Sequence, residues 1–302
     1  MFLHQSVVAQ TSRVIVPDPQ DWVLNAHGNF AGQIERPLRY FPDGRDFVIT
    51  NGVEFFNRPL YCMNAPFRAD GGDKPEFSLY LPGRGGNLRF GLKTSGGVKW
   101  LNDARQIVAR YRPGSMLYEV RDPLLGDSVL NLAVLPLSET RGIIARAELW
   151  GAISPVEWVW VFGGANGMKG QRGGDIGCER EPVAKFFQLR AEQCADSELS
   201  ITQNAFVLRS KTATIAGVAS AGSELAVADA SQWANLAGLL ASANGRERLP
   251  VVVGRVVLSQ GQPVYLALRQ LEHNSQAVSA AGLPNFFSTA EGRRRAIAER
   301  VS

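Results

Sequence analysis

The sequence reads Met116-Leu117-Tyr118-Glu119-Val120 and, a few residues later, Val129-Leu130-Asn131-Leu132-Ala133-Val134. In both stretches the large apolar side chains recur at every second position. Because successive side chains of a β-strand point to opposite faces, this spacing is typical of a strand with one face in a core. The two stretches therefore predict two strands, each with one buried face.

The same alternation recurs over much of the chain, and turn-forming residues separate the runs. Clusters of Gly, Pro, Asn and Asp bound them, for example Pro42-Asp43-Gly44 and Pro82-Gly83-Arg84-Gly85-Gly86. About a dozen short strands with such turns indicate an all-β fold, either an antiparallel sandwich or a barrel. The further runs that we expect to be strands are Phe77–Leu81, Leu88–Leu92, Gly142–Leu149, Val156–Phe162, Leu199–Ile201, Phe206–Leu208, Val251–Leu258 and Val264–Leu268.

Helical patterns are few. Ser231–Ala243 carries one apolar stripe and predicts a short helix inserted between strands. Ser288-Thr289-Ala290-Glu291 resembles a capping box, and the charged stretch Arg293–Val301 after it favours a helix that buries little.

The composition limits the size of the core and the kinds of partner that we expect. The chain has 302 residues, of which 45% are hydrophobic and 20% charged, so it can bury the core of one large sandwich or two small domains. No linker divides it, which favours one domain. A net charge of +4 with a single basic cluster at Arg293–Arg295 argues against a nucleic-acid partner. No run approaches the ~20 apolar residues of a membrane helix, so we expect no membrane partner.

The three cysteines leave two interpretations open. Cys62, Cys178 and Cys194 include no CxxC pair, which excludes a zinc ribbon or a thioredoxin motif. Cys178 and Cys194 would form a disulfide in an oxidising compartment if their Cα atoms lay within about 7 Å. Buried free thiols are the more common state of unpaired cysteines.

Motifs for catalysis are absent from the sequence. The histidines are His4, His27 and His273, without metal-ligand spacing, and no GxSxG elbow occurs. Nothing selects a pair of carboxylates from those that a sandwich carries as turn caps or surface charges. We therefore predict no catalytic residue, no metal site and no cofactor. The carboxylates considered are Asp70, Asp73, Glu76, Asp103, Glu119, Asp122, Glu148, Asp175 and Glu179.

A glycine-rich stretch, Gly163–Asp175, follows the expected strand that ends at Phe162. It has neither the P-loop order nor a following helix, so it is no nucleotide loop. One interpretation is a solvated connection between strands. The other is a functional loop, since long loops without secondary structure are often functional, and Lys169, Arg172 and Asp175 would then project toward a ligand.

Tryptophans are of interest because sugar faces stack on exposed aromatic rings. Trp158 and Trp160 share one strand face and are typical of a core, whereas Trp100 follows Gly96-Gly97 and is the better candidate for an exposed ring. The complete set of ligand-binding candidates is Arg84, Asn87, Trp100, Lys169, Arg172 and Asp175.

Six stretches of the sequence have a distinctive order of residues: Phe41–Gly52, Phe56–Tyr61, Pro75–Leu88, Lys99-Trp100-Leu101, Tyr111–Gly114 and Gly173–Gly177. Together they resemble a bacterial family of unknown function. The resemblance implies that a β-sandwich stands in front of an (α/α)6 six-hairpin glycosidase-type barrel.

The resemblance implies a large antiparallel β-sandwich (a supersandwich, galactose-mutarotase-like) with a short inserted helix and a C-terminal linker helix. Residues 1–19 would be a signal-peptide remnant or a disordered arm, 20–285 the sandwich, and 286–302 the start of a linker helix to a missing (α/α)6 barrel. The protein would be periplasmic or secreted.

The function implied by the resemblance is that of a non-catalytic N-terminal module of a glycoside-hydrolase-like protein, structural or sugar-contacting. Its expected partners are a carbohydrate and the helical barrel of a parent protein. One alternative is a sandwich-borne, mutarotase-like or lyase-like enzyme that uses surface carboxylates and Arg172. A second alternative is a protein-interaction module, which would expose an apolar patch.

Overall fold

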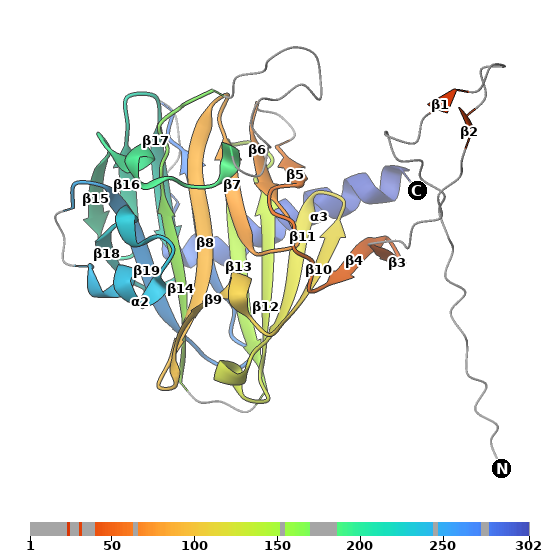
Figure 1. Ribbon diagram of the computed structural model, residues 1–302, viewed down its shortest axis with the longest axis horizontal. Coiled ribbons are helices and arrows are strands. Elements are labelled where there is room, and N and C mark those ends of the chain that lie inside the picture. Colours follow the sequence, from red (N-terminus) through yellow and green to blue (C-terminus); the bar gives the residue numbers. More distant parts are fainter. Residues whose placement is uncertain are drawn as a thin grey trace.

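The protein folds into two large antiparallel β-sheets packed face to face (Figure 1). The computed structural model describes residues 23–24, 30–31, 40–62, 66–151, 155–169, 186–243, 247–272 and 278–301. Over these residues the predicted all-β sandwich is confirmed.

One sheet has ten strands. From edge to edge its strands are β15 (Glu198–Thr202), β16 (Ala205–Arg209), β17 (Thr214–Ala219), β20 (Val264–Gln270), β13 (Gly142–Trp150), β12 (Val129–Pro136), β11 (Ser115–Arg121), β10 (Gln106–Arg112), β4 (Asp46–Thr50) and β3 (Phe41–Asp43).

The second sheet has eight strands, one of which lies off the main path. Its order is β18 (Glu224–Asp229), β19 (Pro250–Leu258), β14 (Val156–Gly163), β8 (Arg84–Thr94), β7 (Glu76–Tyr80), β6 (Arg68–Gly71) and β5 (Arg58–Tyr61), and β9 (Gly97–Trp100) pairs with β8. Two further short strands, β1 (Val23–Leu24) and β2 (Phe30–Ala31), pair with each other.

The core fills the space between the two sheets, as the alternation predicts. Met116, Tyr118 and Val120 of β11 lie in it opposite Val134, Leu132 and Leu130 of β12. Every expected strand run falls on an observed strand, with only Leu81 beyond the end of its strand. The apolar side chains of each of these strands therefore decide which face of the strand points into the core.

Trp158 and Trp160 of β14 are core residues, as expected, and both are fully buried. The ring of Trp158 stacks on Phe90 of the neighbouring strand, with ring centroids 5.4 Å apart. Gly254 lies opposite Trp160 in the register, where a Cβ atom would come within 2.0 Å of the indole. A glycine is therefore needed at this position to admit the large ring.

The outer face of the eight-stranded sheet is covered by short helices and connections. The inserted helix is confirmed, but it is shorter than expected: α2 spans Leu236–Ala241 and follows the 3-10 turn η5 (Ala230–Gln232). The side chain of Asn235 accepts a hydrogen bond from Gly238 N and begins the helix. Leu236 and Leu239 pack over the outward side chains of β14 and β19, which explains why those strands are buried on both faces.

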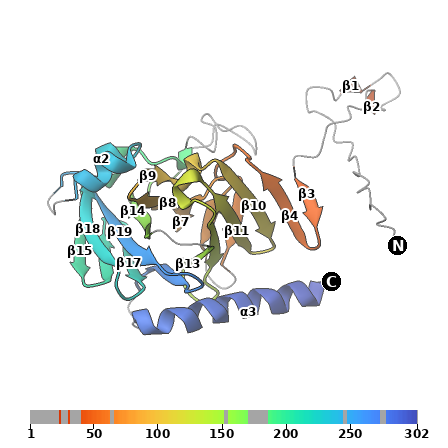
Figure 2. The same ribbon diagram turned by 90° about the horizontal axis from the view of Figure 1, so that it is seen from below.

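The C-terminal helix differs from expectation. It begins at Leu283, after the 3-10 turn η6 (Ala280–Gly282), so the capping-box match at Ser288–Glu291 lies inside the helix and marks no start. Leu283, Phe287 and Ala290 recur at helical spacing and are buried against the outer face of the ten-stranded sheet. The expectation of a helix that buries little is therefore wrong for its first half, as Figure 2 shows for α3 (Leu283–Val301) below the strands.

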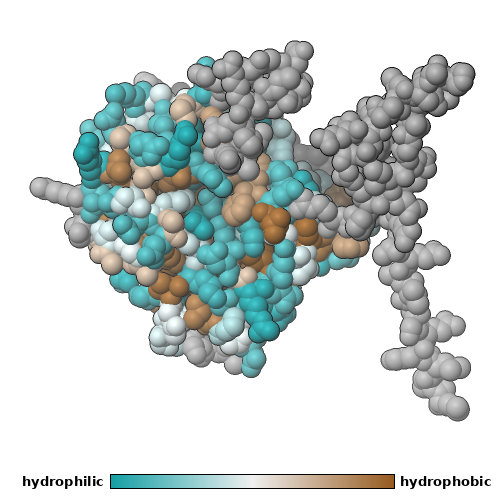
Figure 3. All heavy atoms as spheres, viewed as in Figure 1, coloured by the Kyte–Doolittle hydropathy of each residue, from teal (hydrophilic) through white to brown (hydrophobic). Residues whose placement is uncertain are grey.

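Large apolar side chains are exposed at scattered positions. Phe41 and Phe47 on the β3–β4 hairpin, Tyr61 on β5 and Trp150 on β13 are each at least half exposed. On the face drawn in Figure 3, hydrophobic residues appear in small groups among hydrophilic ones. Such scatter is ordinary for a protein surface.

Phe287→Ala should destabilise the whole domain, because the docked half of α3 contributes to its packing. Removing a buried Phe costs about 3 kcal/mol of unfolding free energy, and urea denaturation would measure it. Thr289→Ala, an exposed change in the same helix, should shift the unfolding free energy by no more than about 0.5 kcal/mol. Equal stabilities of the two variants would contradict the observed docking of α3.

Candidate functional site

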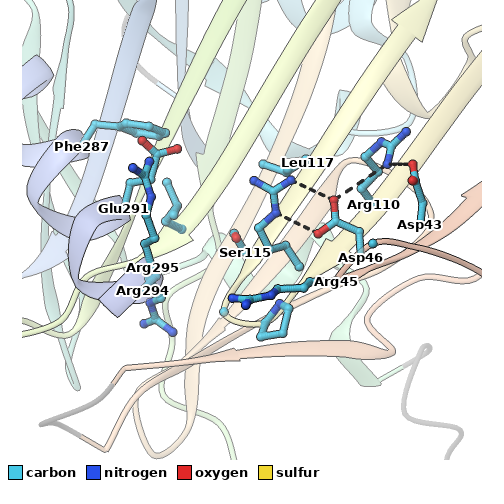
Figure 4. Close-up of a pocket in the computed structure, with 15 residues that line it drawn as sticks. Asp43, Arg45, Asp46, Arg110, Ser115, Leu117, Phe287, Glu291, Arg294 and Arg295 are labelled. Atoms are coloured by element: carbon cyan, nitrogen blue, oxygen red, sulfur yellow. Dashed lines mark hydrogen bonds and ion pairs between the residues drawn. The ribbon is translucent and has the colours of Figure 1, made fainter. Parts of the chain in front are cut away.

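A groove of about 900 Å³ lies between α3 and the outer face of the ten-stranded sheet (Figure 4). Its floor comes from β10 and β11, one wall from the β3–β4 hairpin, and the other wall from α3. The lining residues are Asp43, Gly44, Arg45, Asp46, Arg110, Arg112, Pro113, Gly114, Ser115, Leu117, Leu135, Phe287, Glu291, Arg294 and Arg295.

Strand register brings the charged side chains of the sheet together. Arg110 pairs with Leu117 across β10 and β11, and Asp43 pairs with Asp46 across β3 and β4. Since side chains two apart on a strand share a face, Arg112 lies on the same outer face as Arg110. The alternate side chains of these strands point into the core and fix the strands there. The outward-pointing charged side chains therefore lie on a rigid surface.

The floor carries a network of carboxylates and guanidinium groups. Arg112 donates from Nε and Nη2 to the two carboxylate oxygens of Asp46, each at 2.8 Å. Arg110 donates to Asp43 at 2.5 Å and lies 3.8 Å from Asp46. The hydrogen bonds from Arg112 lower the pKa of the Asp46 carboxyl despite its partial burial. Asp46 is therefore a fixed anion and hydrogen-bond acceptor.

The helix wall contributes an aromatic ring and charges. The guanidinium of Arg146 lies 4.5 Å from the ring centroid of Phe287. Arg294 donates to the backbone carbonyl of Tyr61 at 2.7 Å, and burial lowers its pKa. Glu291 contributes to the raised pKa of Arg112, whose largest cause is the hydrogen bond to Asp46. The wall thus faces the floor with both signs of charge.

The groove continues along the sheet into a smaller hollow. A space of about 200 Å³ shares Arg110 and Leu117 with the groove. It is lined further by Tyr118, Glu119, Asn131, Leu132, Ala133 and Arg146. A chain-like ligand would find polar groups along both spaces.

Two sequence-predicted site residues, Arg84 and Asn87, lie together on the outer face of the other sheet. The Arg84 Nη1 atom donates to Asn87 Oδ1 at 2.9 Å, and Asn87 Nδ2 donates to the carbonyl of Phe187 at 2.7 Å. Arg84 also donates to the carbonyl of Phe186. Both side chains are fully buried and hold the 186–187 backbone against the sheet, so a ligand role for them stays a prediction.

The expected exposure of Trp100 is wrong. Its side chain is 3% exposed, and its Nε1 donates to the carbonyl of Ala234 at 3.2 Å. The Arg89 guanidinium lies 4.4 Å from its ring centroid, and Trp233 packs beside it. The residues around α2 cover it, which the local sequence could not indicate.

The glycine-rich stretch is described only as far as Lys169, which is exposed. Its neighbour Met168 accepts a hydrogen bond from Arg84 N at 2.9 Å, so residues 164–169 run beside the start of β8. Arg172 and Asp175 lie outside the described residues, as do Cys178 and the three histidines. The ligand roles of Lys169, Arg172 and Asp175 stay predictions.

Four of the carboxylates considered in the sequence are buried, contrary to the interpretation as surface charges: Asp70, Asp73, Glu76 and Asp122. Asp122 is a turn cap, as that interpretation also allowed. Burial raises the pKa of Asp70 to about 6, although its partner Arg68 lies 2.9 Å away and opposes the shift. Burial also raises the pKa of Glu76, which Arg89 and Asn102 contact. Asp70 and Glu76 lie on the outer face of the eight-stranded sheet, away from the groove.

Cys62 and Cys194 are buried free thiols, in agreement with the more common state of unpaired cysteines. Burial raises the pKa of Cys194 to about 12, so this thiol stays protonated near neutral pH.

The groove residues were not selected from the sequence, although a signal for them was present. Asp43 and Asp46 fall in the string Phe41–Gly52, and Arg112 falls in Tyr111–Gly114. The basic cluster Arg293–Arg295 supplies the helix wall. Three separate features of the sequence therefore converge on one groove, and only the fold shows that they meet.

Metal and membrane features were also searched. Within the described ranges, no group of three or more His, Cys, Asp or Glu side chains could hold a metal ion. None of the helices that the structure describes is both long enough and apolar enough to span a bilayer.

Residues 81–291 match the family described as Domain of unknown function (DUF4450), and the chain belongs to that family. No curated protein matches the sequence. Among solved structures, the chain is similar to a bacterial glucoamylase complexed with acarbose, with a TM-score of 0.47 and 9% sequence identity. That match covers 82% of this chain and 39% of the glucoamylase chain, so this chain spans less than half of that protein's length.

The buried Asp70 should make stability depend on pH. Its folded-state pKa of about 6 lies above the ordinary value of 3.8, so the folded protein binds the proton more tightly and gains stability as pH falls from 7 toward 4.5. Asp70→Asn should remove about 2 kcal/mol of that gain. Urea denaturation at pH 7.5 and pH 4.5 measures it.

Asp127→Asn, which neutralises an exposed carboxylate, is the matched control for Asp70→Asn and should retain the wild-type pH dependence. Parallel pH profiles for the wild type and Asp70→Asn would contradict the assignment of the gain to Asp70.

Proposed function

We propose that this member of the DUF4450 family is a non-catalytic, sugar-contacting β-sandwich module that holds a glycan in the groove between α3 and the ten-stranded sheet. The observation that carries the proposal is the groove itself. It combines an open space of about 900 Å³ with fixed hydrogen-bonding groups on a rigid sheet.

The polar groups on the floor match the hydroxyl pattern of a sugar. Neighbouring hydroxyls of a sugar ring both donate and accept hydrogen bonds, so they bind well to a planar acceptor beside a planar donor. Asp46 and Arg112 offer this combination, and their two mutual hydrogen bonds hold both planes in place. A preorganised site loses less conformational entropy when it binds.

Apolar contacts complete the match. Leu117 lies on the floor and Phe287 on the helix wall. Ligand sites commonly have volumes of about 300–1,000 Å³ and few convergent polar groups among apolar ones. The adjoining hollow of about 200 Å³ extends the space along the sheet, which supports an oligosaccharide over a single ring.

The state of the carboxylates supports a binding role over catalysis. A glycosidase needs one carboxyl whose raised pKa keeps it protonated as an acid, and a second carboxyl at a defined distance. On the floor of this groove, Arg110 and Arg112 engage Asp43 and Asp46, and the pKa of Asp46 is lowered. Asp46 is therefore suited to hold hydroxyls in place and unsuited to donate a proton to a leaving group.

The proposal extends to the protein in which the module works. The sequence stretches that resemble the bacterial family support a longer, periplasmic or secreted glycoside-hydrolase-like protein. In that protein the module would precede a helical barrel, and the barrel would carry the catalytic residues. The module would then contribute sugar contact and support while the barrel cleaves.

Leu117→Trp should abolish glycan binding, because an indole at this position fills the junction between the groove and the hollow. Isothermal titration calorimetry against a panel of neutral and acidic bacterial and plant oligosaccharides should show a dissociation constant raised at least about tenfold for any ligand that binds the wild type. Leu117 is only half-buried, so circular dichroism should show an intact fold.

Val257→Trp is the matched control, since Val257 is exposed on β19 of the other sheet. This variant should bind as the wild type does. The wild-type chain should also release no reducing ends from the same sugars. Absence of binding across the panel, or equal binding by Leu117→Trp, would refute a sugar site in the groove, and measured turnover would refute the non-catalytic role.

A further inference from the structure

We infer that the groove selects sugars carrying an anionic group, either the carboxylate of a uronic acid or a sulfate ester. This inference rests on the proposed function and narrows its ligand class. It comes from the charges that remain after the internal ion pairs of the groove are assigned.

The groove contains more cations than anions. Its lining includes five arginines and three carboxylates. The pairs Arg110–Asp43 and Arg112–Asp46 neutralise each other in the floor. The remaining charged side chains are Arg45, Arg294, Arg295 and Glu291, so two positive charges are in excess.

Arg294 is half-buried, whereas Arg45 and Arg295 are exposed. It donates from Nη2 to the carbonyls of Tyr61 at 2.7 Å and Pro136 at 3.4 Å, which are neutral acceptors. Its buried Nε has no hydrogen-bond partner. The guanidinium lies against Gly114, where a Cβ atom would come within 2.4 Å of Nη1. The groove therefore holds a partly desolvated cation that has no counter-ion among the described residues, an arrangement that favours an anion from outside.

Arg45 and Arg295 lie at the opening of the groove. Both are exposed, and neither forms a hydrogen bond or ion pair with any other described residue. Figure 4 shows Arg45 on the hairpin side and Arg294 and Arg295 on the helix side. An anion between the two walls would meet guanidinium groups from both. Guanidinium binds carboxylate and sulfate oxygens with two parallel hydrogen bonds, which suits both anion sources.

Binding of matched acidic and neutral sugars tests the inference. The probes are oligogalacturonates and alginate oligosaccharides, each beside the same oligosaccharide with its carboxyl groups reduced to alcohols, and dextran sulfate beside dextran. Calorimetry should give at least about tenfold tighter binding for the anionic member of at least one pair, with a difference that shrinks when NaCl is raised from 50 to 300 mM, since salt screens exposed charges.

A double variant, Arg45→Gln with Arg295→Gln, should weaken the anionic ligand about tenfold and leave the neutral counterpart unchanged. Arg209→Gln is the matched control, because Arg209 is an exposed arginine on β16, at the far side of the ten-stranded sheet. It should bind as the wild type does.

The outcomes separate this inference from the proposed function. Preference for the uronates supports the carboxylate source, and preference for dextran sulfate alone supports the sulfate source. Equal binding of charged and uncharged members, or equal weakening by the double variant and by Arg209→Gln, overturns the anionic selection and leaves the sugar site standing. Absence of binding by every probe and by the wider panel overturns both.

Discussion

The face-to-face packing of two large sheets is the constraint on which the rest of the structure depends. Because the inward side chains of both sheets pack in the core, the side chains that contact covering segments or line the groove lie on the two outward faces. The eight-stranded sheet has its outer face covered by α2, by Trp100 and Trp233, and by the backbone of residues 186–187. Within the described part of the chain, α3 covers the outer face of the ten-stranded sheet over β12, β13 and β20. The groove lies beside the docked helix, between it and the ends of β4, β10 and β11.

The two outer faces use the same residue types with opposite electrostatic results. Asp70 and Glu76 lie under covering segments, and the loss of hydration outweighs their arginine partners, so burial raises their pKa values. Asp46 is also buried, but it accepts two hydrogen bonds from Arg112, and these outweigh the loss of hydration, so its pKa falls. A carboxylate paired with an arginine is thus a buried group with a raised pKa on one sheet and a fixed anion with a lowered pKa on the other. Position in the sandwich, and not residue type, decides between these roles.

The sequence predicted strands that carry several large apolar side chains on the inward face, including β14 and β19, whose outward face is also apolar. β6 (Arg68–Gly71) was not predicted, because Ala69 is its only residue in the core cluster. A single small apolar residue between Arg68 and Asp70 gives no visible alternation in the sequence. The start of α3 was misplaced because Ser288 fits a cap locally, whereas docking of Leu283 and Phe287 decides where the helix begins. The exposure of Trp100 depends on α2, more than a hundred residues away in the chain, and so could not be predicted locally.

The groove illustrates a further limit, since its walls come from opposite ends of the described chain. Asp43 and Arg45 approach Arg294 and Arg295 only after the edge hairpin joins the ten-stranded sheet and α3 docks on it. Phe287 connects the docking of α3 with the groove, because it buries its ring against the sheet and also lines the groove. A ligand that bridges the two walls therefore binds only the docked state, and its binding free energy adds to the stability of that state. Occupancy of the groove by such a ligand would for this reason be linked to the attachment of α3.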